Sequence, residues 1–207
     1  MPTYAPERPE VVRTLELRGG NVEIFEARDA EVLAEGPAGT GKTRTWLALL
    51  NLLCHTYKPL RVLMLRKIQA TMPASCIAEF QQHVLHAGDG VYFFGGSKSE
   101  PAAFRYSNGS IIAVAGLDNA EKVLSSFWDL IYVNEGTDLS EAEWETLTTR
   151  LRGSDPEHAP MDKDGHLFVY RRLVADCNPT YASHWLMRRT DNGRCRLIRS
   201  KLQDNPA

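Results

Sequence analysis

A glycine-rich segment followed by lysine and threonine is the clearest chemical feature of this 207-residue sequence. It fits the pattern G-x-x-x-x-G-K-[ST] at every fixed position. In such a loop, successive backbone N–H groups point at phosphate oxygens, and the N-terminus of the following helix adds partial positive charge. The lysine reaches the β- and γ-phosphates and the hydroxyl can ligate Mg²⁺. The predicted phosphate-binding residues are Gly36, Pro37, Ala38, Gly39, Thr40, Gly41, Lys42, Thr43 and Arg44.

Hydrolysis at such a loop needs a second strand that brings an acid to the attacking water. The run LIYVNE at 130–135 is the best candidate, because four apolar residues end in a polar pair. Glu135 is the expected general base; the alternative is a solvated acid at a strand end. The usual pair is Asp-Glu, whereas here Asn134 occupies the first position. Its amide oxygen can accept a hydrogen bond from a metal-bound water but adds no charge, so we expect weaker Mg²⁺ retention without nucleotide.

Short apolar runs alternate with longer helical patterns, and these elements must position the chemistry. The predicted strands are 30–34, 60–65, 130–133, 173–176 and 196–200. The predicted helices are 43–55, 68–85 and a third that a Ser140–Glu143 capping box opens and that runs to about 151. Asn108-Gly109 predicts a hairpin between 104–106 and 111–114. This alternation predicts an α/β fold of the P-loop NTPase class, with a mostly parallel central sheet flanked by helices.

Composition excludes several other classes of protein. A hydrophobic content of 43% is enough for a globular core, and no apolar run is long enough to cross a membrane. The net charge of -2 gives no overall attraction to nucleic acid, although the basic pairs 171–172 and 188–189 could contact phosphates. Four widely spaced cysteines predict reduced thiols in a cytosolic protein. The polar residues 1–30 are expected to form a lead-in segment with one or two short strands, before a P-loop domain at 31–207.

The order of motifs resembles the N-terminal ATPase domain of tailed-bacteriophage large terminases, the DNA-packaging motors. The resemblance runs from about residue 31 to the end. It rests on the P-loop, LRKIQA, NGSII, GLDNAEKV, LIYVNEGTDLS, DCNPT, HWL and DNP, in that order. It implies an ASCE, RecA-like fold, in which an extra strand lies between the P-loop strand and the strand that bears the acid. It also implies ATP and Mg²⁺ as cofactors.

The resemblance gives roles to further residues. The segment ending in Asp176, Asn178 and Pro179 matches the motif that senses the γ-phosphate and passes its loss to DNA-gripping parts; the alternative for Asn178 is an Asn-Pro turn after a strand. Arg66 matches the arginine after the family's second strand, which could stabilise phosphate charge; a surface ion pair is the alternative. The catalytic set is therefore Glu135, Lys42 and Asn178, with Thr43 and, through water, Asn134 at the metal. Candidates for a trans-acting arginine finger, or a lysine in its place, are Arg150, Arg152 and Lys122.

The function that the resemblance implies is Mg²⁺-dependent ATP hydrolysis that drives double-stranded DNA into a procapsid. The implied partners are the DNA, the portal protein, the small terminase subunit and further copies of the chain in a five-membered ring, in the cytoplasm of the bacterial host. An isolated domain could instead be monomeric. No second cluster of strand-borne carboxylates is visible, so we expect no nuclease domain and no nuclease activity. Two alternatives remain: a helicase-like, nucleic-acid-dependent ATPase, and a nucleotide-dependent assembly module that hydrolyses poorly.

Overall fold

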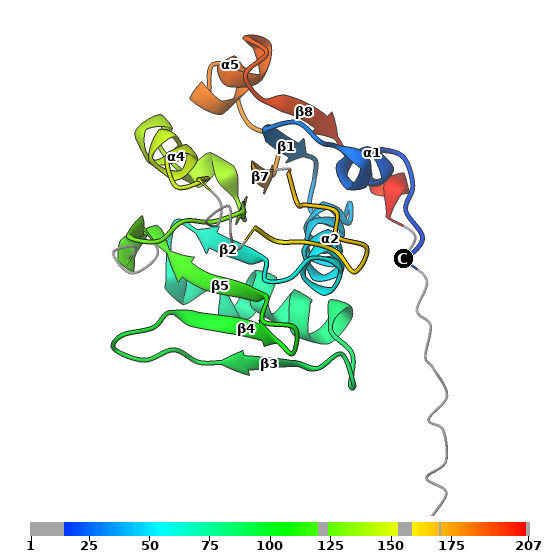
Figure 1. The fold of residues 1–207 in the computed structure, drawn as a ribbon. Coiled ribbons are helices and arrows are strands. Elements are labelled where there is room, and N and C mark those ends of the chain that lie inside the picture. Colours follow the sequence, from blue (N-terminus) through cyan, green and yellow to red (C-terminus); the bar gives the residue numbers. More distant parts are fainter. Residues whose placement is uncertain (1–14, 120–123, 153–158, 170, 206–207) are drawn as a thin grey trace, which may run out of the picture.

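The computed structural model describes residues 15–119, 124–152, 159–169 and 171–205. One eight-stranded sheet forms its centre. In chain order the strands are β1 (Glu31–Glu35), β2 (Arg61–Arg66), β3 (Val91–Phe94), β4 (Ala102–Tyr106), β5 (Ile111–Gly116), β6 (Leu130–Val133), β7 (Arg172–Cys177) and β8 (Arg196–Arg199). The spatial order is β3-β4-β5-β2-β6-β7-β1-β8 (Figure 1). β4 runs antiparallel to both β3 and β5, and the other neighbouring pairs are parallel.

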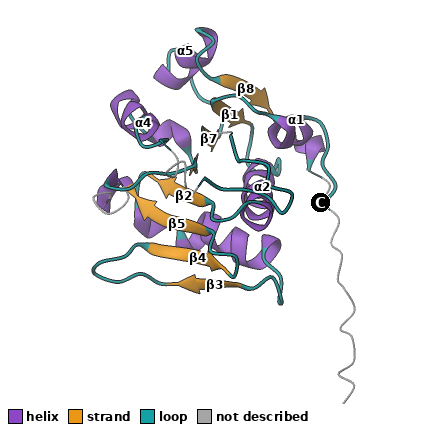
Figure 2. Ribbon diagram, viewed as in Figure 1, coloured by secondary structure: helices purple, strands orange, loops and turns teal. Residues whose placement is uncertain are grey.

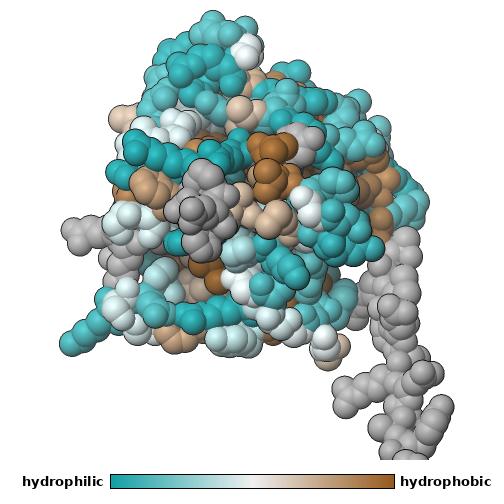
Figure 3. Space-filling model, viewed as in Figure 1, coloured by the Kyte–Doolittle hydropathy of each residue, from teal (hydrophilic) through white to brown (hydrophobic). Residues whose placement is uncertain are grey.

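Helices cover both faces of this sheet (Figure 2). They are α1 (Gly20–Glu26), α2 (Lys42–Thr56), α4 (Glu141–Thr148) and α5 (Trp185–Asp191). One hydrophobic core joins the sheet to α1, α2 and the segment 69–84, and a second core joins the opposite face to α4 and α5. On the face shown in Figure 3 the surface is mainly hydrophilic, with hydrophobic groups gathered near its middle.

Side-chain alternation along the strands assigns each position to one of these cores. Tyr132 and Val174 belong to the core on the α2 side, whereas Val133 and Ala175 belong to the core on the α4 side. Because the period of a strand is two, the next even-numbered positions, 134 and 176, continue the α2 side. This parity decides which polar side chains meet where the strands end.

The predicted α/β architecture is confirmed, including the strand that the resemblance placed between the P-loop strand and the acid-bearing strand. β1 leads into the P-loop, β6 leads to Glu135, and β7 pairs with both. The hairpin is also confirmed, with Gly109 at φ 89° between β4 and β5. The capping box is present at Ser140 and Glu143, and α4 ends at Thr148, three residues before its expected end.

One expectation about secondary structure is wrong in the described residues, and another holds only in part. In the described part of the lead-in, residues 20–26 form helix α1 rather than a short strand, because Ile24 is fully buried in the core and tertiary packing decides the local structure. The rest of the expected lead-in, residues 1–14, lies outside the described residues. The expected helix at 68–85 is present only from 73 to 84 and is irregular: a 3-10 turn at Gln69–Thr71 precedes it, and it is a π-helix at Pro73–Ile77 and at Phe80–Val84. Strand β3 and helix α5 were not predicted.

The break in the 69–84 segment has a local cause. Pro73 has no backbone N–H to donate. The hydroxyl of Ser75 donates to the carbonyl oxygens of Thr71, at 2.9 Å, and Met72, at 3.2 Å, which a regular helix would use for its backbone ladder. Ser75 itself departs from helical geometry, with φ -126° and ψ -110°.

Two further observations bear on chemical class. All four cysteines are free thiols, as predicted; they are also buried, and burial raises the pKa of each thiol. Within the described ranges, none of the helices combines the length and the apolar character needed to cross a bilayer.

Candidate nucleotide-binding site

The P-loop joins the end of β1 to the start of α2. Gly39 and Gly41 have φ of 82° and 85°, values at which a side chain would be strained. Gly41 lies directly before the first helical residue, Lys42, so the N-terminus of α2 faces the loop. Glycine at these two positions therefore allows the turn that aims backbone N–H groups and the helix dipole into one place.

Side chains from both ends of the described chain form hydrogen bonds with the backbone of the P-loop. The side-chain amide of Asn205 donates to the carbonyl oxygen of Gly39 at 2.8 Å, and that of Asn21 donates to the carbonyl oxygen of Thr40 at 2.9 Å. The carboxylate of Asp204 accepts from the backbone N–H of Gly20 at 3.1 Å. The red C-terminal turn lies next to α1 in Figure 1. Neither Asn21 nor Asp204 was predicted as a site residue, although the DNP motif was noted.

A polar hollow of about 220 Å³ lies over the loop. It is lined by 39–44 together with Glu79 and Asn205. The guanidinium of Arg44 pairs with the carboxylate of Glu79 at 2.6 Å, which fixes Arg44 at the wall of the hollow. Sequence reasoning missed Glu79 because it lies 35 residues from Arg44 with no motif around it.

Lys42 and Asn178 lie together, as the catalytic set requires. The ammonium of Lys42 is buried and donates to the carbonyl oxygen of Pro37 at 3.1 Å and to Oδ1 of Asn178 at 3.4 Å. Asn178 is exposed and follows β7 directly. A side chain that contacts the P-loop lysine from a neighbouring strand end can respond to a phosphate held there.

Asp176 is the centre of the polar network at these strand ends. Its Oδ2 accepts hydrogen bonds from the hydroxyls of Thr43, at 2.5 Å, and Tyr132, at 2.7 Å. Its Oδ1 accepts from Nδ2 of Asn134 and from the backbone N–H of Glu135, both at 3.0 Å. The carboxylate is buried, and these contacts connect the P-loop, β6 and β7. Sequence reasoning placed Asp176 in a motif but gave it no role of its own.

Asn134 retains one unused acceptor. Its side chain is buried and directs Nδ2 at Asp176, while its Oδ1 has no hydrogen-bond partner among the described residues. Buried polar atoms are normally paired, so an orphaned oxygen at this position indicates a missing partner. The Thr43 hydroxyl, the Asp176 carboxylate and this amide oxygen are the oxygen donors that suit a hydrated Mg²⁺, and the donor set therefore fits that ion.

Glu135 is held in an unusual backbone conformation. It is the only non-glycine residue with positive φ in the described ranges, at φ 58° and ψ 58°. Left-handed geometry at a residue other than glycine costs free energy and is found at functional sites. Burial raises the pKa of the Glu135 carboxyl, and the Asp176 charge raises it further, while Arg66 and Lys42 act in the opposite direction. A raised pKa suits a general base.

The predicted arginines separate into near and far positions. Arg66 ends β2 and lies close enough to Glu135 to act on its charge. Arg150 and Arg152 lie elsewhere: the carbonyl oxygen of Arg150 accepts from the backbone N–H of Trp128, before β6 begins, and the guanidinium of Arg152 lies over the Phe127 ring. Both are thus at the opposite end of β6 from Glu135. Lys122 lies outside the described residues.

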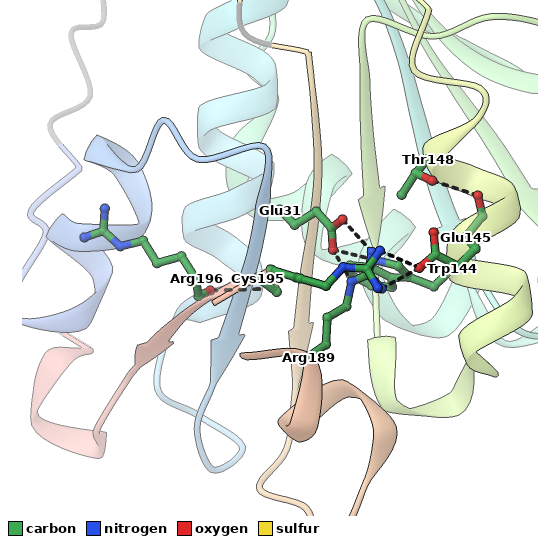
Figure 4. A network of polar contacts seen from close by, with 8 residues as sticks. Glu31, Trp144, Glu145, Thr148, Arg189, Cys195 and Arg196 are labelled. Carbon is green, nitrogen blue, oxygen red and sulfur yellow. Dashed lines mark hydrogen bonds and ion pairs between the residues drawn. The ribbon is translucent and has the colours of Figure 1, made fainter. Parts of the chain in front are cut away.

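Each of the two basic pairs considered for phosphate contact exposes one arginine and buries the other. Arg172 and Arg189 are buried, so only Arg171 and Arg188 of the two pairs face solvent. The guanidinium of Arg189 forms ion pairs with the carboxylates of Glu31 and Glu145 (Figure 4). Adjacent residues on a strand or a helix point in different directions, which the sequence pair alone did not take into account.

Comparison with known proteins gives both a family and a fold. The model of the family described as phage terminase large subunit matches residues 29–205. The structure is similar to that of the large terminase from a thermophilic bacteriophage, with a TM-score of 0.70 and 11% identity over 92% of this chain. The same phage's large terminase in complex with ADP gives a TM-score of 0.69, again with 11% identity over 92% of this chain.

The chain spans about half the length of these solved relatives, 47% of the first and 46% of the second. At 11% identity the likeness shows the fold, and the family match shows the lineage. No curated protein matches this sequence.

Proposed function

The chain belongs to the phage terminase large subunit family, and on that premise we propose that it is the ATP-hydrolysing motor domain that drives double-stranded DNA into a viral procapsid. The observation that carries the proposal is the convergence of three strand ends. The P-loop after β1, Asn178 after β7 and Glu135 after β6 all lie at the carboxyl edge of the parallel sheet, where such folds bind ligands.

The residues divide the work as follows. The P-loop backbone and Lys42 hold the phosphates, and Glu135 orients the attacking water and accepts its proton. Asn178, in contact with Lys42, responds to the loss of the γ-phosphate. Arg66 offsets negative charge beside Glu135. Mg²⁺, when bound near Thr43 and Asn134, supplies charge neutralisation for the β- and γ-phosphates. The proposed ATPase domain begins before residue 31, because Ile24 of α1 is part of its core.

The proposed partners follow from the family. They are double-stranded DNA, a portal protein, a small terminase subunit and further copies of this chain in a five-membered ring, in the cytoplasm of the bacterial host. Structures of the thermophilic phage's large terminase exist in complex with ADP and with ATP-γ-S. This supports an adenine nucleotide as the ligand of the hollow over the P-loop.

The test is ATP turnover by Lys42→Ala and Glu135→Ala in the presence of Mg²⁺. We expect both to lose most phosphate release, with Lys67→Ala as the matched control because Lys67 pairs with Glu143 and is not part of the proposed machinery. Unchanged turnover in either site variant would contradict the assignment. Tight ATP binding without phosphate release by the unaltered chain would instead favour the poorly hydrolysing assembly module, which the neutral Asn134 leaves room for.

A further inference from the structure

The charge that the Asp-Glu pattern places on β6 is missing from position 134, and a buried carboxylate stands next to it on β7. From this arrangement we propose that Asp176 supplies the metal-site carboxylate of this ATPase, in place of an aspartate at 134. The proposal rests on the proposed function and adds to it a residue that the sequence motif does not identify.

Position and direction support this role. Ala34 of β1 pairs in register with Asp176, so the carboxylate is one strand away from the strand that leads into the P-loop. Parity places Tyr132, Asn134 and Asp176 on the α2 side of the sheet, which is the side of the P-loop threonine. The hydrogen bond from the Thr43 hydroxyl to Asp176 Oδ2, at 2.5 Å, joins the two groups that a P-loop enzyme uses at its metal: the loop hydroxyl and a strand-borne carboxylate.

The contact between Asn134 and Asp176 explains why a carboxylate at position 176 goes together with a neutral side chain at position 134. Nδ2 of Asn134 donates to Oδ1 of Asp176 at 3.0 Å. An aspartate at 134 would replace this donor with a second carboxylate oxygen at a similar distance, and two like charges this close oppose one another. An asparagine at 134 is therefore compatible with a carboxylate at 176, and its Oδ1 has no partner among the described residues and is free to accept a hydrogen bond.

The experiment measures metal dependence apart from turnover. A fluorescent ADP analogue is titrated with and without Mg²⁺, and Mn²⁺ bound together with ADP is followed by electron paramagnetic resonance. For Asp176→Asn we expect the gain in nucleotide affinity on adding Mg²⁺ to fall about 10- to 100-fold, with affinity in EDTA unchanged. The exchanged variant Asn134→Asp/Asp176→Asn returns the carboxylate to β6 and should recover metal dependence.

Asp129→Asn is the matched control. Asp129 is also a buried carboxylate, but it lies directly before β6 and accepts from the backbone N–H of Arg61 at the start of β2, at the end of these strands away from the P-loop. Metal dependence should not change in this variant. If Asp176→Asn proves unfolded by circular dichroism, the exchanged variant alone carries the test, because it keeps the number of carboxylates and alters only the strand.

Different outcomes would contradict the role of Asp176 and the proposed ATPase function. The role of Asp176 is overturned if Asp176→Asn is folded and gains as much nucleotide affinity from Mg²⁺ as the unaltered chain does. It is also overturned if the exchanged variant is folded and gains no nucleotide affinity from Mg²⁺. Absence of nucleotide binding by the unaltered chain, or binding that Lys42→Ala leaves unaffected, overturns the proposed function itself.

Discussion

Two polar networks lie at opposite ends of the β1–β7 pair, each centred on a buried charged side chain, Arg189 or Asp176, and they are built differently. At the amino end of β1, the guanidinium of Arg189 donates to Glu31 at 2.5 and 2.7 Å and to Glu145 at 2.6 Å, and the indole N–H of Trp144 donates to Glu31 at 2.9 Å (Figure 4). At the carboxyl end, Asp176 joins the P-loop to β6.

The two networks differ in whether their polar groups all have partners within the described residues. In the Arg189 network, cation and carboxylates satisfy one another: Glu31 raises the pKa of Arg189, and Arg189 lowers that of Glu145. In the Asp176 network, the Asp176 charge contributes to raising the pKa of Glu135, and the oxygen of Asn134 has no partner among the described residues. A closed network contributes to stability, whereas an open one is prepared for a ligand. Changes at the first should therefore affect folding and changes at the second should affect chemistry.

The largest expected effect is at the open end. Glu135→Gln keeps the shape of the side chain but removes the general base, and we expect kcat for ATP hydrolysis to fall about 10²- to 10⁴-fold while nucleotide affinity is preserved. Steady-state turnover and equilibrium binding measure the two quantities separately. Glu141→Gln, at an exposed position in α4, is the control. An equal loss of nucleotide affinity and turnover would mean that Glu135 has a structural role in the site, which would contradict the assignment of this network to chemistry.

The next effect is at the closed end. Arg189→Ala leaves Glu31 without its cation, and we expect the free energy of unfolding to fall by about 3 kcal/mol. Urea unfolding monitored by circular dichroism gives this value. Arg188→Ala is the matched control, since Arg188 is the neighbouring arginine on the same helix and is exposed. Nucleotide affinity of folded Arg189→Ala should equal that of the unaltered chain; a selective loss of affinity would show that the two networks are coupled.

A smaller change in the same network is Trp144→Phe. It deletes the indole N–H that donates to Glu31 and keeps an aromatic ring, although a smaller one, in the core. A hydrogen bond to a charged group is worth about 1.5 kcal/mol in net stability, and we expect a loss of about that size. Thermal unfolding measures it, and an unaltered melting temperature would mean that Arg189 alone satisfies Glu31.

The smallest effect has the opposite sign. Glu135→Asn places a residue that tolerates left-handed geometry at φ 58° and removes a carboxylate whose pKa is raised by burial and by Asp176. We expect the free energy of unfolding to increase by about 1 kcal/mol while hydrolysis is lost. Such a gain would identify the strain at Glu135 as a cost of function, and a destabilised variant would contradict that interpretation.

The positions of the P-loop with Lys42, and of Glu135 after a buried strand, could be predicted from the sequence, because each depends on residues that are adjacent in the chain; their catalytic roles stay predictions. The strand between β1 and β6 was implied by the family resemblance, because the order of strands in the sheet joins distant segments. The role proposed for Asp176 depends on the pairing of β6 with β7, which brings Asp176 next to Asn134, 42 residues away in the sequence. A signal was present, since Asp176 is the one acid within the apolar run LVADC, but only strand register shows that its side chain meets Asn134. Helix α1 was not predicted either, because the hydrophobic core that stabilises it is formed by segments that are distant in the sequence.

The burial of all four cysteines has a practical consequence. Thiols that are shielded from solvent and hard to deprotonate react slowly with alkylating dyes. A single cysteine introduced in place of Leu202, which is 64% exposed and lies against Gly39, would therefore take up a dye selectively. Such a dye would lie next to the P-loop, where we expect its fluorescence to change when a nucleotide binds.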